Sequence, residues 1–84
     1  MITIITKGYC PYCHMAVGIL KKLNIEYKNI DITLDDTLYQ EVQNITGSHT
    51  VPQVFIWDIH WEFLGWYTEL NSLYNSWELE KLLK

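Results

Sequence analysis

The two cysteines of the sequence are separated by only two residues, in the segment Cys10-Pro11-Tyr12-Cys13, which directly follows the apolar run 2–6. A strand over that run would deliver Cys10 to the beginning of a helix, where proline is favoured at the first position and backbone N–H groups have no helical partner. Such N–H groups stabilise a thiolate. Cys13, one turn later, could then resolve a mixed disulfide formed on Cys10. The spacing therefore predicts dithiol redox chemistry, with Cys10 and Cys13 as the catalytic pair.

Half of a zinc site is the other interpretation of two cysteines at this spacing. Structural zinc takes about four ligands, and the sequence contains no second pair of cysteines. His14, His49 and His60 could complete a site only in an unusual arrangement. We therefore expect no metal and no permanently bound cofactor.

Composition limits the class of protein. The 84 residues, 49% of them hydrophobic, are enough for one domain over residues 1–84 with its own core. Six Lys and Arg residues and a formal net charge of −4 argue against nucleic acid as a partner. No apolar run approaches the ~20 residues of a membrane span, so no membrane contact is expected. With only two cysteines there is no disulfide framework, which favours a reducing compartment, the cytoplasm.

The first half of the chain alternates strand and helix patterns. Apolar spacing predicts a helix over 11–23 that stops at Asn24, and a strand over 25–32 parallel to the first because a helix crosses between them. Thr33 and Asp36 resemble a capping box for a second helix that ends at Gly47. The apolar face expected for that second helix consists of Leu34, Leu38, Val42 and Ile45.

The second half predicts a hairpin and a helical end. The β-forming runs 51–57 and 60–66 are joined by a short connection, which is typical of antiparallel strands. Thr68 is expected to cap a helix, and Ser76 to begin a short final helix over 77–83. The apolar side of the helix after Thr68 would carry Leu70, Leu73, Tyr74 and Trp77. The order β-α-β-α-β-β-α predicts an α/β fold in which helices flank both faces of a four-stranded mixed sheet.

Two segments resemble the dithiol glutaredoxins. The segment 7–14, Lys-Gly-Tyr-Cys-Pro-Tyr-Cys-His, is similar to the active-site loop of that family, and 50–56 is similar to the Thr-Val-Pro segment that faces it. The resemblance implies the thioredoxin fold. It also implies a glutathione-dependent thiol-disulfide oxidoreductase that reduces protein disulfides and glutathionylated cysteines, with glutathione as co-substrate.

The resemblance also implies a binding site for glutathione. Its expected residues are Lys7, Tyr12, Thr50, Val51, Pro52, Gly65, Thr68 and Glu69, with the Val51-Pro52 bond in cis. Trp66 departs from the family pattern because it replaces the second residue of a Gly-Gly pair. The basic residue that commonly precedes the Thr-Val-Pro segment is also missing, which leaves Lys7 as the cation for a carboxylate.

Two further functions remain open at this stage. A thioredoxin-like reductant recharged by a flavoprotein reductase would fit Trp66 and the missing basic residue. A carrier that bridges an iron-sulfur cluster through Cys10 and glutathione is less compatible with Pro11, which stiffens the loop. Disulfide-containing proteins are the expected partners, with ribonucleotide reductase as the family-level example, and the chain is expected to be a monomer.

Overall fold

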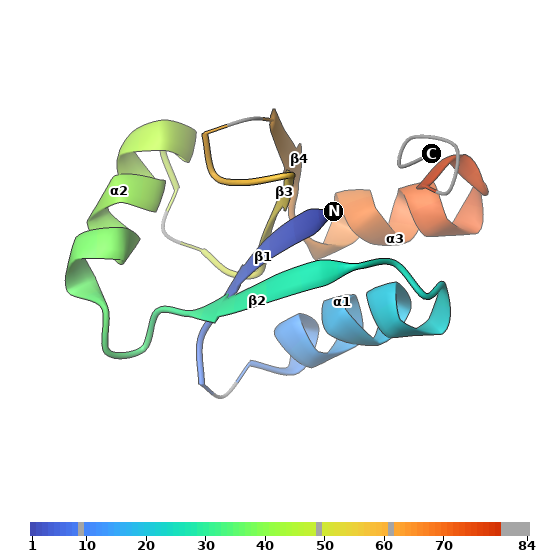
Figure 1. The fold of residues 1–84 in the computed structure, drawn as a ribbon, viewed down its shortest axis with the longest axis horizontal. Coiled ribbons are helices and arrows are strands. Elements are labelled where there is room, and N and C mark those ends of the chain that lie inside the picture. The colour runs from blue at the N-terminus through green and yellow to red at the C-terminus, as the bar shows by residue number, and fades with distance from the viewer. Residues whose placement is uncertain (9, 49, 61, 80–84) are drawn as a thin grey trace.

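A computed structural model describes residues 1–8, 10–48, 50–60 and 62–79 (Figure 1). The elements follow in the order β1 (Ile2–Thr6), α1 (Pro11–Lys22), β2 (Tyr27–Asp31), α2 (Asp36–Thr46), β3 (Gln53–Ile56), β4 (Glu62–Gly65) and α3 (Tyr67–Asn75). The strand order in the sheet is β2-β1-β3-β4. β1 runs parallel to β2 and antiparallel to β3, and β3 runs antiparallel to β4, so the mixed sheet and the hairpin are confirmed. Among the described helices none is long and apolar enough to cross a membrane.

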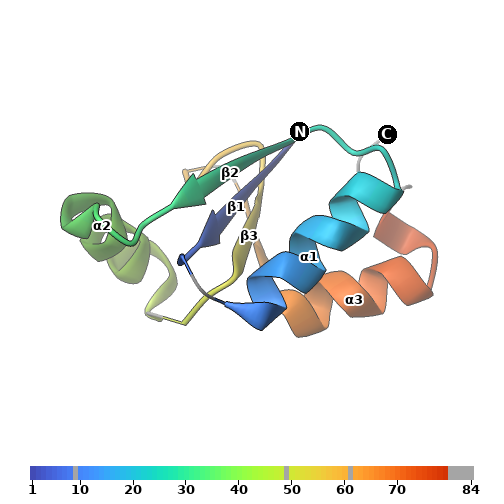
Figure 2. The ribbon, with the colours of Figure 1, turned by 90° about the horizontal axis from the view of Figure 1, so that it is seen from below.

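Helices cover both faces of this sheet. α1 and α3 lie side by side on one face and α2 lies on the other (Figure 2). Successive side chains of a strand point to opposite faces, which explains the division of β1 between two apolar clusters. Ile2 and Ile4 pack with α1 and α3, whereas Ile5 packs with Val42 of α2. The buried strand β1 therefore contributes side chains to both apolar clusters and contacts the helices on both faces of the sheet.

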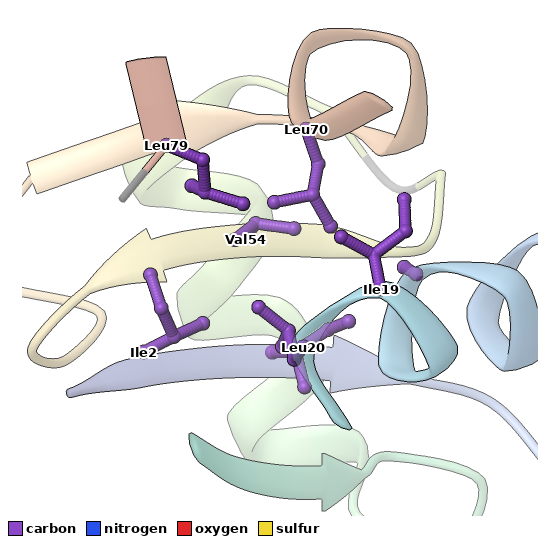
Figure 3. Packing of buried hydrophobic residues seen from close by; sticks show 8 residues of the cluster. Ile2, Ile19, Leu20, Val54, Leu70 and Leu79 are labelled. Atoms are coloured by element: carbon purple, nitrogen blue, oxygen red, sulfur yellow. The ribbon is translucent and has the colours of Figure 1, made fainter. Parts of the chain in front are cut away.

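The larger cluster joins the ends of the described chain to its middle (Figure 3). Ile2 of β1, Leu20 of α1, Val54 of β3, Leu70 of α3 and Leu79 are each fully buried in it. Burying a Leu or Ile side chain contributes about 1.5–3 kcal/mol of stability. These contacts hold α1 and α3 against the same face, so the first turns of the two helices lie at the same end of the sheet.

The beginning of α2 differs from the prediction. Asp35 is the capping residue, and its carboxylate accepts a hydrogen bond from the backbone N–H of Leu38 at 3.0 Å. The expected capping box of Thr33 with Asp36 is wrong, because the Thr33 side chain is bonded to Asp31 instead. Leu34 therefore lies outside the helix and is 97% exposed, not part of its apolar face. Gly47 does end α2, with a φ of 73°.

The beginning of α3 also differs from the prediction. Trp66 occupies the capping position and Tyr67 begins the helix, so Thr68 is its second residue and not its cap. The helix ends at Asn75, just before Ser76, as expected. Trp77 is 71% exposed at a φ of 65°, so its placement on the apolar side is wrong. Residues 80–83 of the expected final helix lie outside the described residues.

Candidate active site

The sulfur of Cys10 acts as the capping group of α1. Pro11 begins the helix, and the backbone N–H of Cys13 donates a hydrogen bond to the Cys10 sulfur at 3.3 Å. The N-terminus of a helix carries roughly half a positive charge, and an N–H directed at sulfur bonds more strongly to a thiolate than to a thiol. The local sequence thus gives Cys10, which is half-buried, the surroundings of a nucleophile.

Cys13 is placed as the resolving cysteine. Its side chain is 4% exposed on the inner side of α1, one turn from Cys10. Burial raises the pKa of the Cys13 thiol to about 12, and the hydrogen bond that this thiol donates to the Cys10 side chain and the nearby charge of Asp31 act in the same direction. A backbone N–H of Lys7 partly opposes them. Cys13 is therefore protonated near neutral pH and does not compete with Cys10 for a substrate.

The segment before β3 faces Cys10. The Cys10 thiol points to the carbonyl oxygen of Val51 at 4.0 Å, across 41 positions of sequence, and the Val51-Pro52 bond is cis as expected. Fully buried Gln53 holds this segment in place, because its side-chain amide donates to the carbonyl oxygens of Ser48 and Thr50 at 3.0 and 2.9 Å. Gln53 was not among the predicted site residues. A polar side chain that directly follows the proline at the start of an apolar strand was the available signal.

A groove with a volume of about 320 Å³ lies between these elements. α1, the segment before β3 and the first turn of α3 meet there, as Figure 2 shows for their ribbons. We call this hollow the front groove, and it is lined by Tyr12, Thr50, Val51, Pro52, Trp66, Tyr67 and Thr68. Tyr12 and Tyr67 make a tilted ring contact, with centroids 5.5 Å apart. Five of the predicted binding residues are therefore brought together, and Trp66 and Tyr67 join them.

Gly65 and Glu69 shape the groove without lining it. The Glu69 carboxylate accepts a hydrogen bond from the backbone N–H of Trp66 at 2.8 Å and so closes the first turn of α3. Gly65 has a φ of 132°, and Glu69 occupies the space that a side chain at Gly65 would need. The Trp66 ring packs edge-on against Phe63, with centroids 4.9 Å apart. Sequence reasoning expected Glu69 to meet a ligand directly, whereas the structure uses it to cap the helix.

Lys7 lies apart from the front groove. Its ammonium group stands 4.6 Å from the centre of the Tyr39 ring, on the side of α2. Lys7 also borders a second hollow with a volume of about 290 Å³. Its other lining residues include Cys13, His14, Lys21 and Asp31. Lys7 is therefore not among the residues that line the front groove, and its role as a cation for a ligand carboxylate stays a prediction.

Comparison with known proteins agrees with this geometry. The glutaredoxin family model matches residues 2–61. The chain belongs to the glutaredoxin family. Glutaredoxins are thiol-disulfide oxidoreductases, which confirms the activity predicted from the cysteine pair.

Two other glutaredoxins show how far the likeness extends. Glutaredoxin from Neisseria meningitidis is 31% identical over 83 residues, which cover 98% of this chain and 94% of that protein. Glutaredoxin-C8 from Oryza sativa is 32% identical over 87 residues, and the match covers 98% of this chain but only 62% of the rice protein. The crystal structure of a buckwheat glutaredoxin-glutathione complex shares the fold, with a TM-score of 0.85, 24% identity and coverage of 98% of this chain and 74% of that one. The thioredoxin fold expected from the resemblance is confirmed.

Proposed function

We propose that this chain reduces protein disulfides and glutathionylated cysteines and that glutathione returns it to the dithiol form. The observation that carries the proposal is the sulfur of Cys10, which caps α1 beside the front groove while Cys13 stays buried one turn away. A half-buried nucleophile next to a groove, backed by a shielded second thiol, is suited to exchange with an incoming disulfide.

The reaction proceeds in two exchange steps. The Cys10 thiolate attacks one sulfur of the substrate disulfide, forms a new disulfide with it and releases the other sulfur as a thiolate. Cys13 then gives up its proton and attacks the Cys10 sulfur, which releases the second substrate thiolate and leaves a Cys10–Cys13 disulfide. One released thiolate takes up the proton of Cys13, and the other takes up a proton from the solvent. Two molecules of glutathione then reduce the disulfide and leave as glutathione disulfide.

The first turn of α3 supports glutathione as the co-substrate. Thr68 lines the front groove in that turn, where backbone N–H groups attract a carboxylate such as that of a γ-glutamyl group. The buckwheat protein that shares this fold was crystallised with glutathione. Because the sequence holds only these two cysteines, we also propose that the chain works in a reducing compartment, the cytoplasm. Ribonucleotide reductase remains a proposed example of a protein substrate, and a monomeric state is proposed with it.

The two cysteines can be separated by experiment. Cys13→Ser should keep glutathione-dependent reduction of a small glutathionylated substrate, which needs only Cys10, and should lose most of its activity on a protein disulfide. Cys10→Ser should lose both activities and serves as the matched control. Equal loss of both activities in Cys13→Ser would contradict the proposal, provided that circular dichroism shows the folded protein. A mixed disulfide trapped by Cys13→Ser would identify the protein substrate.

A further inference from the structure

Gln53, the first residue of β3, has a polar side chain that is fully buried. It lies on the α2 side of the sheet, because strand residues alternate and Phe55, two positions later, packs with Val42 of α2. Its side-chain amide donates two hydrogen bonds, but its own oxygen, Oε1, is buried without a partner among the described residues. A buried polar atom without a partner lowers stability, so stability alone does not account for a glutamine at this position.

The two hydrogen bonds of Gln53 end on the segment before β3. They reach the carbonyl oxygens of Ser48 and Thr50 at 3.0 and 2.9 Å. The same two residues are joined to each other, because the backbone N–H of Thr50 donates to the Ser48 hydroxyl oxygen at 3.3 Å. The backbone N–H of Ser48 donates in turn to the side-chain oxygen of Thr46, at the end of α2, at 3.3 Å. The segment is thus held by α2 on one side and by Gln53 on the other.

The hydrogen bond to Thr50 also determines the direction of the next N–H group. The carbonyl of Thr50 and the N–H of Val51 belong to one peptide unit, which is trans. A peptide unit is planar, and in the trans form its C=O and N–H point in opposite directions. Because the Thr50 carbonyl points to buried Gln53, the Val51 N–H points away from Gln53. The hydrogen bonds of the described residues leave this N–H without an acceptor.

The main chain of Val51 lies beside the reacting sulfur. Val51 lines the front groove, and its carbonyl oxygen is 4.0 Å from the sulfur of Cys10. A free N–H and a carbonyl oxygen on one residue are the groups with which an extended peptide pairs as an added strand. A substrate cysteine that pairs with Val51 in this way has its own sulfur brought close to Cys10.

We propose that Gln53 is a positioning residue that directs the Val51 N–H to the main-chain carbonyl of the substrate cysteine, and so favours disulfides that carry this carbonyl. This inference rests on the proposed function, because it concerns the disulfide that Cys10 attacks. Gln53 itself is buried and acts through Thr50 and Val51. Without the side-chain amide, the peptide unit of Thr50 and Val51 can rotate, and its N–H is no longer held in the bonding direction.

The test compares two neutral disulfides. N,N′-diacetylcystine bis(methylamide) carries the main-chain carbonyl of cysteine, and N,N′-diacetylcystamine lacks it. The reduced protein is mixed with each disulfide in stoichiometric amount without glutathione, and the second-order rate constant of its reduction is followed by chromatography. Each rate constant is divided by that for dithiothreitol, which removes the intrinsic reactivity of the disulfide.

Three variants complete the test. Gln53→Met replaces the amide with an unbranched apolar chain of similar length. Gln53→Glu keeps the shape of the side chain, removes its NH₂ group and serves as the second variant should the first fail to fold. Gln40→Met is the matched control, because Gln40 is exposed on α2 and its amide donates to Asn44, away from the front groove. Circular dichroism shows which variants are folded.

The wild type and Gln40→Met should reduce the cystine derivative about fivefold faster than the cystamine derivative, a difference of ~1 kcal/mol. In Gln53→Met this ratio should fall to about twofold or less because one hydrogen bond to the substrate is lost, while the rate for the cystamine derivative stays unchanged. A purely structural role of Gln53 would slow both disulfides alike. Equal rates in the wild type, equal slowing of both disulfides, or a ratio that the folded Gln53 variant retains would overturn the inference.

Glutathione turnover is measured separately on the same samples. If the two disulfides react at equal rates while glutathione recharges the oxidised protein, the inference fails and the proposed function stands. If the ratio depends on Gln53 but glutathione does not recharge the protein, the inference stands and the choice of glutathione as reductant fails.

Discussion

Gly65→Ala should destabilise the protein by about 2.5 kcal/mol, because Gly65 has a strained backbone conformation and lies against the Glu69 side chain. Gly65 has a φ of 132°, a region that residues with a side chain rarely adopt. Holding alanine there costs about 1–3 kcal/mol. A methyl carbon on Gly65 would also lie 2.7 Å from Cγ of Glu69 and 2.9 Å from its Oε1.

The second contribution comes from the first turn of α3. Glu69 would have to move away from the added methyl group and lose its hydrogen bond to the N–H of Trp66. Losing a helix cap costs about 0.5–2 kcal/mol. Alanine restricts the unfolded chain more than glycine does and returns roughly 0.4–1 kcal/mol. The balance is a net loss of stability between about 0.5 and 4.6 kcal/mol, with a centre near 2.5 kcal/mol.

Urea unfolding at 25 °C, followed by far-UV circular dichroism, measures this free energy. Gly18→Ala is the matched control, since Gly18 lies in α1 and a methyl carbon there meets nothing within 4 Å. Helix propensity predicts that the control is stabilised by about 0.5–1 kcal/mol. A loss below about 0.5 kcal/mol for Gly65→Ala, comparable with a neutral surface substitution, would refute the reasoning.

A double variant separates the two causes. If Glu69 is the obstacle, Gly65→Ala with Glu69→Ala should cost less than the sum of the two single changes, because the cap can be lost only once. The shortfall should be about 0.5–2 kcal/mol, the free energy of the cap. Strict additivity would mean that the loss arises from the backbone conformation of Gly65 alone.

Three further outcomes are expected. Iodoacetamide near pH 7 should label Cys10 almost exclusively, because Cys13 is buried and its pKa is raised to about 12; preferential labelling of Cys13, read by peptide mass, would contradict the assignment. The folded state favours the thiol form of Cys13, because the pKa of Cys13 is raised from 9.0 to about 12. The stability that this thiol contributes is therefore complete below pH 9.0 and is lost as the pH rises from 9.0 toward 12. Between pH 8 and 10 the free energy of unfolding of the reduced wild type should thus fall by about 1.4 kcal/mol more than that of Cys13→Ser, and equal losses would contradict the raised pKa. Thr33 accepts a hydrogen bond from the backbone N–H of Gly8 at 2.7 Å, so Thr33→Val should speed hydrogen exchange at Gly8 about fivefold, for a bond worth ~1 kcal/mol, whereas Thr37→Val should leave it unchanged.

The sequence by itself determined the elements that depend on local pattern. The spacing of Cys10 and Cys13 after an apolar strand predicted a helix that begins at the cysteine pair, and that helix is present. The β-forming runs also predicted the four strands of the sheet. The position of Gly47 predicted the end of α2. These features follow from interactions within a few residues, which a single sequence records directly.

Only the tertiary structure decided where individual side chains point. Successive residues of an α-helix are rotated by about 100°, so a shift of one or two residues at a helix start redirects a side chain completely. The start of α3 at Tyr67 gives Glu69 to the cap and places Tyr67 against Tyr12, a contact across 55 positions that no local pattern records. Lys7, which follows β1, likewise lies over the ring of Tyr39 of α2, a contact that depends on the assembled fold. The groove is formed by three segments that are distant in sequence, and its lining residues therefore came together only when the core had brought these segments to one place.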